Sequence, residues 1–297
     1  MTVRPADSDE RDGGDGKSGS NAPVEVAAVL GAVRDDVRQT LRTAWLDPAV
    51  EAASTYPVFF TAAWSAIRPN VGKSFLALAR RLRSDAVEVL RIGFDLPDLR
   101  KRLEGDLSEE EIRRIEESAR AAHLTTAKAQ IVAHALHRAV RMERIPGTGR
   151  EEPPIRRGVP EWQRWMSFQP APQNTRPILD QVMHDLVLPA PPVPLRLLAR
   201  WPTALATLWD ELRPTVRTAT WKAGTSRLRR LVLAGISSLP HPVELQWAAL
   251  KARGFTEEDR LQLADVLAAH DAAMPTQTLT SAFSWAAFGA PEIGVEG

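Results

Sequence analysis

The sequence predicts an all-α protein made of two pseudo-symmetric helical repeats of about 120 residues that pack as an internal pseudo-dimer. Two observations predict this architecture. The second half of the chain restates the first at an offset of 145 residues, and the apolar residues follow helical rather than strand periodicity. Solenoid repeats run roughly 20 to 50 residues, so copies of this length indicate a duplicated domain that closes on itself.

The duplication is clearest where an aromatic residue is followed by proline in each half. The segment 56–71 (YPVFFTAAWSAIRPNV) aligns with 201–216 (WPTALATLWDELRPTV), which pairs Trp64 with Trp209. Upstream, 33–41 aligns with 178–186. Downstream the register drifts slightly, and the matched segments are 81–83 with 227–229, 96–97 with 239–240, and 108–111 with 256–259. The agreement on both sides indicates two copies of one helical unit.

Local signals predict where individual helices lie. The first helix is expected over 26–41, where apolar residues recur every three or four positions and charged residues take the opposite face. Ser108 with Glu111, and Thr256 with Asp259, have the spacing of capping boxes at helix starts. Prolines recur at matched places in both copies and are expected to start, end or kink helices there; they are residues 57, 69 and 97, and 202, 214 and 240.

The domain boundaries follow from composition. We expect a disordered tail over 1–22, the first repeat over 23–143, a linker over 144–176, the second repeat over 177–290 and a short C-terminal tail over 291–297. The linker is rich in Pro and Arg but also holds Trp162, Trp165 and Phe168. A purely flexible linker has no use for three large aromatic side chains, so this segment is expected to pack against the repeats.

Composition also excludes several classes of function. With 38 basic and 37 acidic residues and no basic stripe, no nucleic-acid partner is expected. The chain has no cysteine, which excludes disulfides and is typical of a cytoplasmic protein. No secretory signal is visible, and the longest uncharged stretch, 52–67, has 16 residues and contains Pro57. It is too short to span a bilayer, so no membrane association is expected.

The sequence offers little support for a metal or another cofactor. His123, His134 and His137 have spacings that place them near one face of a helix, but no carboxylate or thiolate accompanies them in the sequence. We therefore interpret them as a solvated surface stripe with the arginines that follow. The glycine–serine elbow of serine hydrolases is absent as well.

The tryptophans suggest a ligand pocket. The chain has nine tryptophans and one tyrosine, and Trp45, Tyr56 and Trp201 lie in or near the matched segments. Indole N–H groups donate hydrogen bonds to an anion in an apolar pocket, which suits a small carboxylic acid or a halide. Trp45 aligns with Ala190, so the two repeats have different residues at this position. A tryptophan that only one repeat carries favours a functional role over a shared packing role.

Several segments together resemble the group I 2-haloacid dehalogenases. They are 37–45 (VRQTLRTAW), 54–64 (STYPVFFTAAW), 96–103 (LPDLRKRL), and the ARWP and DELRPTV segments near Trp201. The resemblance runs from about Val26 to Ala290 and includes the duplication. It implies an all-α fold of two repeats, a site between them, a small carboxylic acid ligand and a homodimer. The implied reaction is direct displacement of halide by a water that a carboxylate activates, with inversion and no ester intermediate.

One position departs from the family. The resemblance places Trp45 at a pocket tryptophan and Thr126 at an asparagine that positions the water, but it places Pro194 where the family has its catalytic aspartate. No Asp, Glu or Asn occurs between Leu186 and Trp209, so a shifted alignment does not restore the base. A proline cannot accept a proton.

Two replacements for the base are candidates. Asp47 lies beside Trp45 and aligns with Pro192, so the pseudo-symmetry is expected to bring it to the same cavity from the other repeat. His123 and Asp271 align with one another at an offset of 148, and a His/Asp pair across the pseudo-twofold is the second candidate. Two function classes stay open: a hydrolase of small 2-haloacids, and a non-catalytic or repurposed member of the fold that binds a small carboxylic acid.

Overall fold

The computed structural model describes residues 22–153, 155, 157–166 and 171–289. Residues 1–21 and 291–297 of the two expected tails lie outside these ranges. The described residues form helices and no β-strand, with two isolated bridges, Glu104 with Leu107 and Ile145 with Val243. The predicted all-α fold is confirmed.

Twelve α-helices make up the described chain. The first half contains α1 (Ala22–Leu41), α2 (Pro48–Ala53), α3 (Pro57–Ile67), α4 (Lys73–Gly93), α5 (Leu99–Leu103) and α6 (Glu109–Val140). The second contains α7 (Arg176–Leu186), α8 (Val193–Leu198), α9 (Pro202–Val216), α10 (Ala219–Gly235), α11 (Trp247–Lys251) and α12 (Glu257–Ala287). Three short 3₁₀ turns, 68–70, 161–163 and 236–238, complete the elements.

The local signals explain most helix starts. Pro57 and Pro202 stand at the first helical position of α3 and α9, where the missing N–H costs nothing. Ser108 and Thr256 form the predicted capping boxes at the starts of α6 and α12. Pro214 is tolerated inside α9, close to its C-terminal end.

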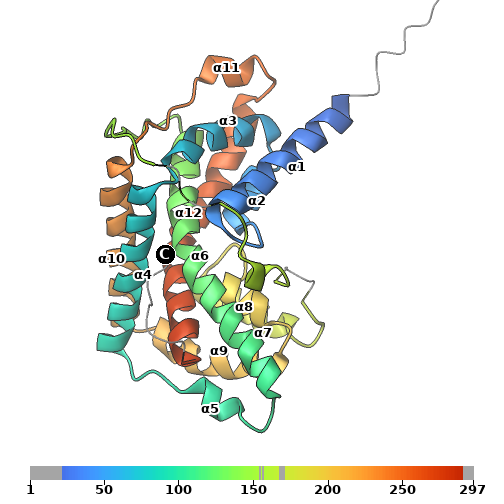
Figure 1. The fold of residues 1–297 in the computed structure, drawn as a ribbon, viewed down its shortest axis with the longest axis vertical. Coiled ribbons are helices and arrows are strands. Elements are labelled where there is room, and N and C mark those ends of the chain that lie inside the picture. The colour runs from blue at the N-terminus through green and yellow to red at the C-terminus, as the bar shows by residue number, and fades with distance from the viewer. Residues whose placement is uncertain (1–21, 154, 156, 167–170, 290–297) are drawn as a thin grey trace, which may run out of the picture.

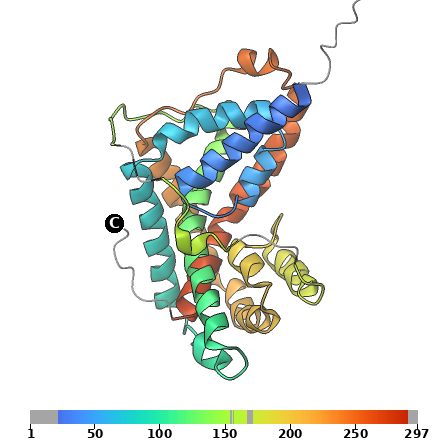
Figure 2. The same cartoon turned by 45° about the vertical axis from the view of Figure 1, so that its right-hand side comes forward.

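Helices α6 and α12 run antiparallel through the centre of the molecule (Figure 1). Thr278 Oγ1 donates a hydrogen bond of 2.7 Å to Gln130 Oε1, and Ser281 Oγ one of 2.9 Å to Thr126 Oγ1. Residues that advance along α12 therefore meet residues that recede along α6. The helices α1, α2, α3 and α11 gather at one end of this pair, and α7, α8 and α9 lie beside its other half (Figure 2).

On a flank of the central pair, α4 and α10 pack side by side (Figures 1 and 2). Their backbones approach closely because Gly224 has no side chain: a Cβ there would come within 2.6 Å of Val89 Cγ1. Larger residues at position 224 would force the helices apart.

The linker packs against the helices, as its aromatic residues predicted. Trp165 donates a 3.2 Å hydrogen bond from its indole to Glu117 and lies under the guanidinium of Arg114. Met166 is 1% exposed. Phe168 is not among the described residues.

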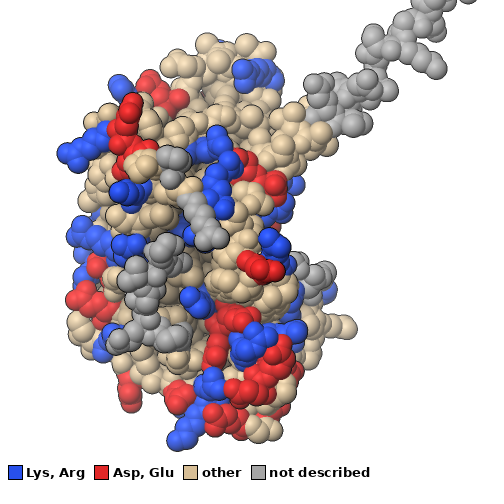
Figure 3. All heavy atoms as spheres, in the orientation of Figure 1, with Lys and Arg blue, Asp and Glu red and all other residues tan. Residues whose placement is uncertain are grey.

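Charged side chains of both signs intermix at the end of the molecule that carries α5 and the start of α6 (Figure 3). Arg100 lies between Glu109 and Glu116 there, and Arg113 pairs with Glu110. Separately, none of the helices described is long and apolar enough to cross a membrane.

Candidate active site

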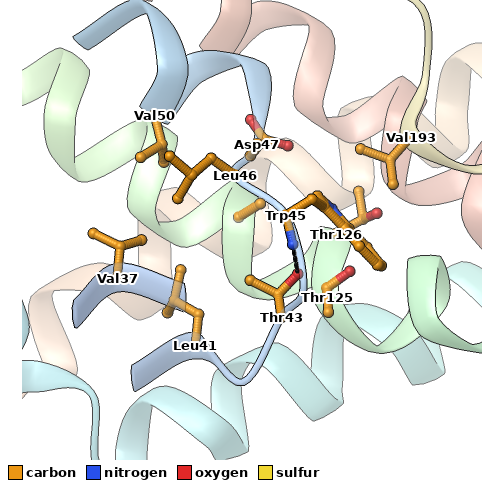
Figure 4. Close-up of a pocket in the computed structure, with 11 residues that line it drawn as sticks. Val37, Leu41, Thr43, Trp45, Leu46, Asp47, Val50, Thr125, Thr126 and Val193 are labelled. Atoms are coloured by element: carbon orange, nitrogen blue, oxygen red, sulfur yellow. Dashed lines mark hydrogen bonds between the residues drawn. The ribbon is translucent and has the colours of Figure 1, made fainter. Parts of the chain in front are cut away.

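A small cavity lies where the turn between α1 and α2 meets α6 and α8 (Figure 4). Its volume is about 20 Å³, which is room for roughly one water molecule. Most of the lining is aliphatic; the polar or aromatic members are Thr43, Trp45, Asp47, Thr125 and Thr126. Three residues that the sequence singled out, Trp45, Asp47 and Thr126, are therefore brought to one cavity.

The turn that carries Trp45 and Asp47 begins with a left-handed residue. Arg42 has φ 56°, and Thr43 N donates to Arg38 O at 3.0 Å, which closes the end of α1. Lys128 Nζ on α6 donates to Leu41 O at 3.1 Å and satisfies a carbonyl that the helix leaves unpaired. These bonds anchor the turn to α6.

Asp47 is the N-cap of α2 and the only carboxylate that lines the cavity among the described residues. Its Oδ1 accepts from Ala49 N at 3.0 Å, and its buried Oδ2 has no hydrogen-bond partner in the described part of the chain. Burial raises the pKa of Asp47 from 3.8 to about 6; the Ala49 N–H opposes this, Glu51 adds to it, and Arg196 opposes it. The group is thus poised to exchange a proton near neutral pH.

Trp45 forms one wall of the cavity and is 5% exposed. It packs with a small apolar cluster contributed by α6, the linker and α8, whose members are Ala121, Ala122, Met166, Val193 and Leu197. The linker therefore contributes to holding the wall in place through Met166. Sequence reasoning linked Trp45 to the pocket but gave no role to Met166 or Val193.

Two threonines on α6 offer oxygen atoms as acceptors. Thr126 Oγ1 donates to Ala122 O at 2.8 Å, and Thr125 Oγ1 donates to Ala121 O at the same distance. Each hydroxyl proton is taken by the helix backbone, and Thr126 Oγ1 also accepts from Ser281 Oγ at 2.9 Å. Acceptor capacity is therefore what each hydroxyl can still offer a bound molecule, and at Thr126 it is one lone pair. Thr125 was missed in the sequence; its only signal was its position beside Thr126.

Three predicted ligand-binding residues lie outside this cavity. Tyr56 and Trp201 are the N-cap residues of α3 and α9; Tyr56 stands edge-on to Phe255, and Trp201 edge-on to Trp165. Pro194 is buried in α8, and its neighbour Val193 takes the place at the cavity wall. An aromatic side chain next to a helix-starting proline packs on the helices beside it, which explains the first two positions.

The predicted pair of His123 and Asp271 does not form. His123 stacks on Trp285 with ring centroids 4.7 Å apart, whereas Asp271 binds His134 and His137 at 3.0 and 2.9 Å. The reason is the antiparallel packing of α6 and α12. His123 lies seven positions before Gln130 on α6, and Asp271 lies seven positions before Thr278 on α12. Because the helices run in opposite directions, the two offsets add along the pair. At 1.5 Å per residue they separate the two residues by roughly 21 Å.

The histidines accordingly have separate environments rather than the solvated stripe that we expected. Burial, with a smaller effect of Arg83, lowers the pKa of His123 to about 3, so its imidazole is neutral at pH 7. Burial raises the pKa of Asp271, but the hydrogen bonds and charges of His134 and His137 together outweigh it and lower that pKa to about 2.

Comparison with known proteins gives consistent results. No protein-family model matches the sequence. The chain is 26% identical over 220 residues to an (R)-2-haloacid dehalogenase of Rhizobium sp. (strain NHG3), which covers 71% of this chain and 84% of that protein.

Solved structures of D-2-haloacid dehalogenase have the same fold. One, a mutant in complex with D-2-CPA, has a TM-score of 0.78 at 20% identity and covers 87% of this chain and 91% of that one. Another, in complex with L-LA, has a TM-score of 0.77 at 19% identity, with 87% and 92% covered. In sequence and in fold, the protein resembles the group I 2-haloacid dehalogenases.

Proposed function

We propose that the protein hydrolyses the carbon–halogen bond of small 2-haloalkanoic acids, with Asp47 as the general base. The observation that carries this proposal is the buried carboxylate of Asp47, with its raised pKa, in the same cavity as Trp45 and Thr126. The resemblance supplies the reaction class, and the cavity supplies a base in place of the aspartate that Pro194 replaces.

The reaction needs one water and one proton acceptor. Asp47 takes a proton from the water while the water oxygen forms a bond to the α-carbon, and the halide leaves from the opposite side with the bonding electron pair. Thr126 Oγ1 accepts the second hydrogen of the water, since its own proton is held by Ala122 O. The products are a 2-hydroxy acid of inverted configuration, a halide ion and a proton that Asp47 later releases.

The electrostatics of Asp47 suit this role. A carboxylate with a pKa of about 6 is mostly ionised at pH 7.5 and is a stronger base than an exposed aspartate. The aliphatic lining strengthens its interaction with the water because few other dipoles compete.

A second candidate function is binding of a small carboxylic acid without turnover. One observation favours it: Pro194 stands where the family has its catalytic aspartate. Under this alternative Asp47 serves only as the helix cap of α2.

We also propose that the two halves form a pseudo-dimer and that whole chains form a homodimer. The helix bounds support the first part: α2 and α8, and α3 and α9, begin 145 residues apart, and α6 and α12 begin 148 apart. The resemblance to the group I 2-haloacid dehalogenases supports the homodimer. Light scattering coupled to gel filtration tests the homodimer, since a monomer mass would reject it.

Halide release separates the two functions. The purified full chain is incubated with each enantiomer of 2-chloropropionate and 2-bromopropionate, and the Asp47→Asn variant is assayed in parallel. The matched control is Asp98→Asn, because Asp98 is also an N-cap aspartate, accepting from Lys101 N at 3.0 Å, but lies away from the cavity.

We expect release that Asp47→Asn reduces by about 10²- to 10⁴-fold and that Asp98→Asn leaves unchanged. Full activity in Asp47→Asn would reject this residue as the base. No release from any substrate, with thermal stabilisation by 2-chloropropionate, would establish the binding function instead.

A further inference from the structure

A second cavity, of about 70 Å³, lies on the other side of the turn between α1 and α2. Four cationic side chains line it: Arg42 from the turn, Arg80 and Arg83 from α4, and Lys128 from α6. No acidic side chain is among the described residues of its lining. Because these cations come from three elements, their convergence is a product of the tertiary fold.

Two of the cations are buried within the protein. Arg83 is 3% exposed and Lys128 is 5% exposed. Charged groups are seldom buried to this extent, and like charges around one cavity repel one another more strongly as water is removed. An anion between them lowers this repulsion.

Two polar atoms at the same cavity have no hydrogen-bond partner in the described part of the chain. They are Thr40 Oγ1, on a side chain that is 5% exposed, and the buried Nε of Arg42. Buried donors of this kind are ordinarily satisfied by protein, water or a ligand. A hydroxyl and a guanidinium N–H at one cavity are both suited to the oxygen atoms of an anion.

We propose that this cavity binds a small oxyanion of the phosphate class. The planar guanidinium group presents paired donors that match two oxygens of a phosphate, and three arginines line the cavity. The lysine adds a point charge and Thr40 a neutral donor. The volume of about 70 Å³ accommodates several waters or one such anion.

The position of the cavity gives the anion a second role. Thr40 and Arg42 line the cationic cavity, whereas Leu41 and Thr43 line the cavity of Asp47. Residues 40–43 therefore form the wall between the two cavities. A bound anion anchors the end of α1 and stiffens the turn that positions Trp45 and Asp47.

The test is isothermal titration of the full chain with inorganic phosphate at low ionic strength and pH 7.5. We expect one phosphate per chain. Arg42→Gln should weaken binding by about tenfold or more, because it removes a charge-assisted hydrogen bond. Thr40→Val, which keeps the shape of the side chain, should weaken it severalfold. The matched control is Arg91→Gln, an exposed arginine near the end of α4 that lines neither cavity, and it should bind phosphate as the native chain does.

Three results would overturn the proposal. They are an absence of phosphate binding by the native chain, an equal loss in Arg91→Gln, and equally tight binding of acetate or chloride at matched ionic strength. Circular dichroism shows whether each variant is folded. If Arg42→Gln does not fold, Thr40→Val decides the question, and unchanged phosphate affinity in that variant rejects the site. Halide release plays no part in this test, so its outcome is independent of the proposed activity.

Discussion

Asp47→Asn should make the protein more stable at neutral pH. Asp47 is 7% exposed, and its Oδ2 has no hydrogen-bond partner in the described residues. Its pKa is raised from 3.8 to about 6, a shift of about two units, which corresponds to roughly 3 kcal/mol against the folded state when the group is ionised. Asparagine caps helices as well as aspartate does. It lacks the negative charge, however, whose favourable interaction with the start of the helix is worth about 0.3 to 1 kcal/mol. The expected net gain in the free energy of unfolding is about 2 kcal/mol.

The sign of the pH dependence follows from the order of the two pKa values. On raising the pH, the unfolded chain releases this proton near 3.8 and the folded chain near 6. The unfolded state therefore binds fewer protons in this window, and the contribution of Asp47 to stability falls as the pH rises from about 4 to 6. The advantage of Asp47→Asn should be absent below pH 4, grow between pH 4 and 6, and be complete above it.

Urea unfolding of both proteins at pH 4.0, 5.0 and 8.0 measures this difference. The control is Asp98→Asn, which removes an N-cap carboxylate at the start of α5 without opening or filling the cavity. The reasoning would be refuted if Asp47→Asn were less stable than the native chain at pH 8, or if its advantage did not depend on pH. The same substitution should reduce halide release by about 10²- to 10⁴-fold, so a variant that is stable but nearly inactive also shows that activity was not lost by unfolding.

Three further perturbations test other parts of the structure. Met166→Ala should lower the free energy of unfolding by about 2 to 5 kcal/mol, because Met166 is 1% exposed beside Trp45; an unchanged urea midpoint would show that the linker is not packed there. Asp271→Asn should destabilise the protein by about 1 to 2 kcal/mol at pH 5, since the pKa of Asp271 is lowered to about 2. The contribution of ionised Asp271 to the free energy of unfolding is complete above about pH 4 and lost as the pH falls to about 2. Equal urea unfolding curves for the native chain and Asp271→Asn at pH 5 would contradict this prediction. Ser108→Ala should cost about 1 kcal/mol through loss of the capping box at α6, measured by thermal unfolding, and a stability equal to that of the native chain would exclude the cap.

The sequence by itself determined the all-α class, several helix starts, and Trp45 and Asp47 of the candidate site. Helical periodicity, capping boxes and helix-starting prolines act within a few residues, so they can be read without knowing the fold. Trp45 was singled out because the repeat has Ala190 in its place, and Asp47 because it lies beside Trp45 and aligns with Pro192. The two residues stand two positions apart on one turn, so both line the same cavity. Thr126 was located through the family resemblance.

The tertiary structure decided the rest. The register of α6 against α12 set the partners of His123 and Asp271, and no local signal reports how two helices more than 100 residues apart align. The burial that raises the pKa of Asp47 depends on α6 and α8 covering it. The cationic cavity required the turn after α1, helix α4 and helix α6 to converge. Burial and long-range register arise only when distant segments pack, and the electrostatics of both cavities follow from that packing.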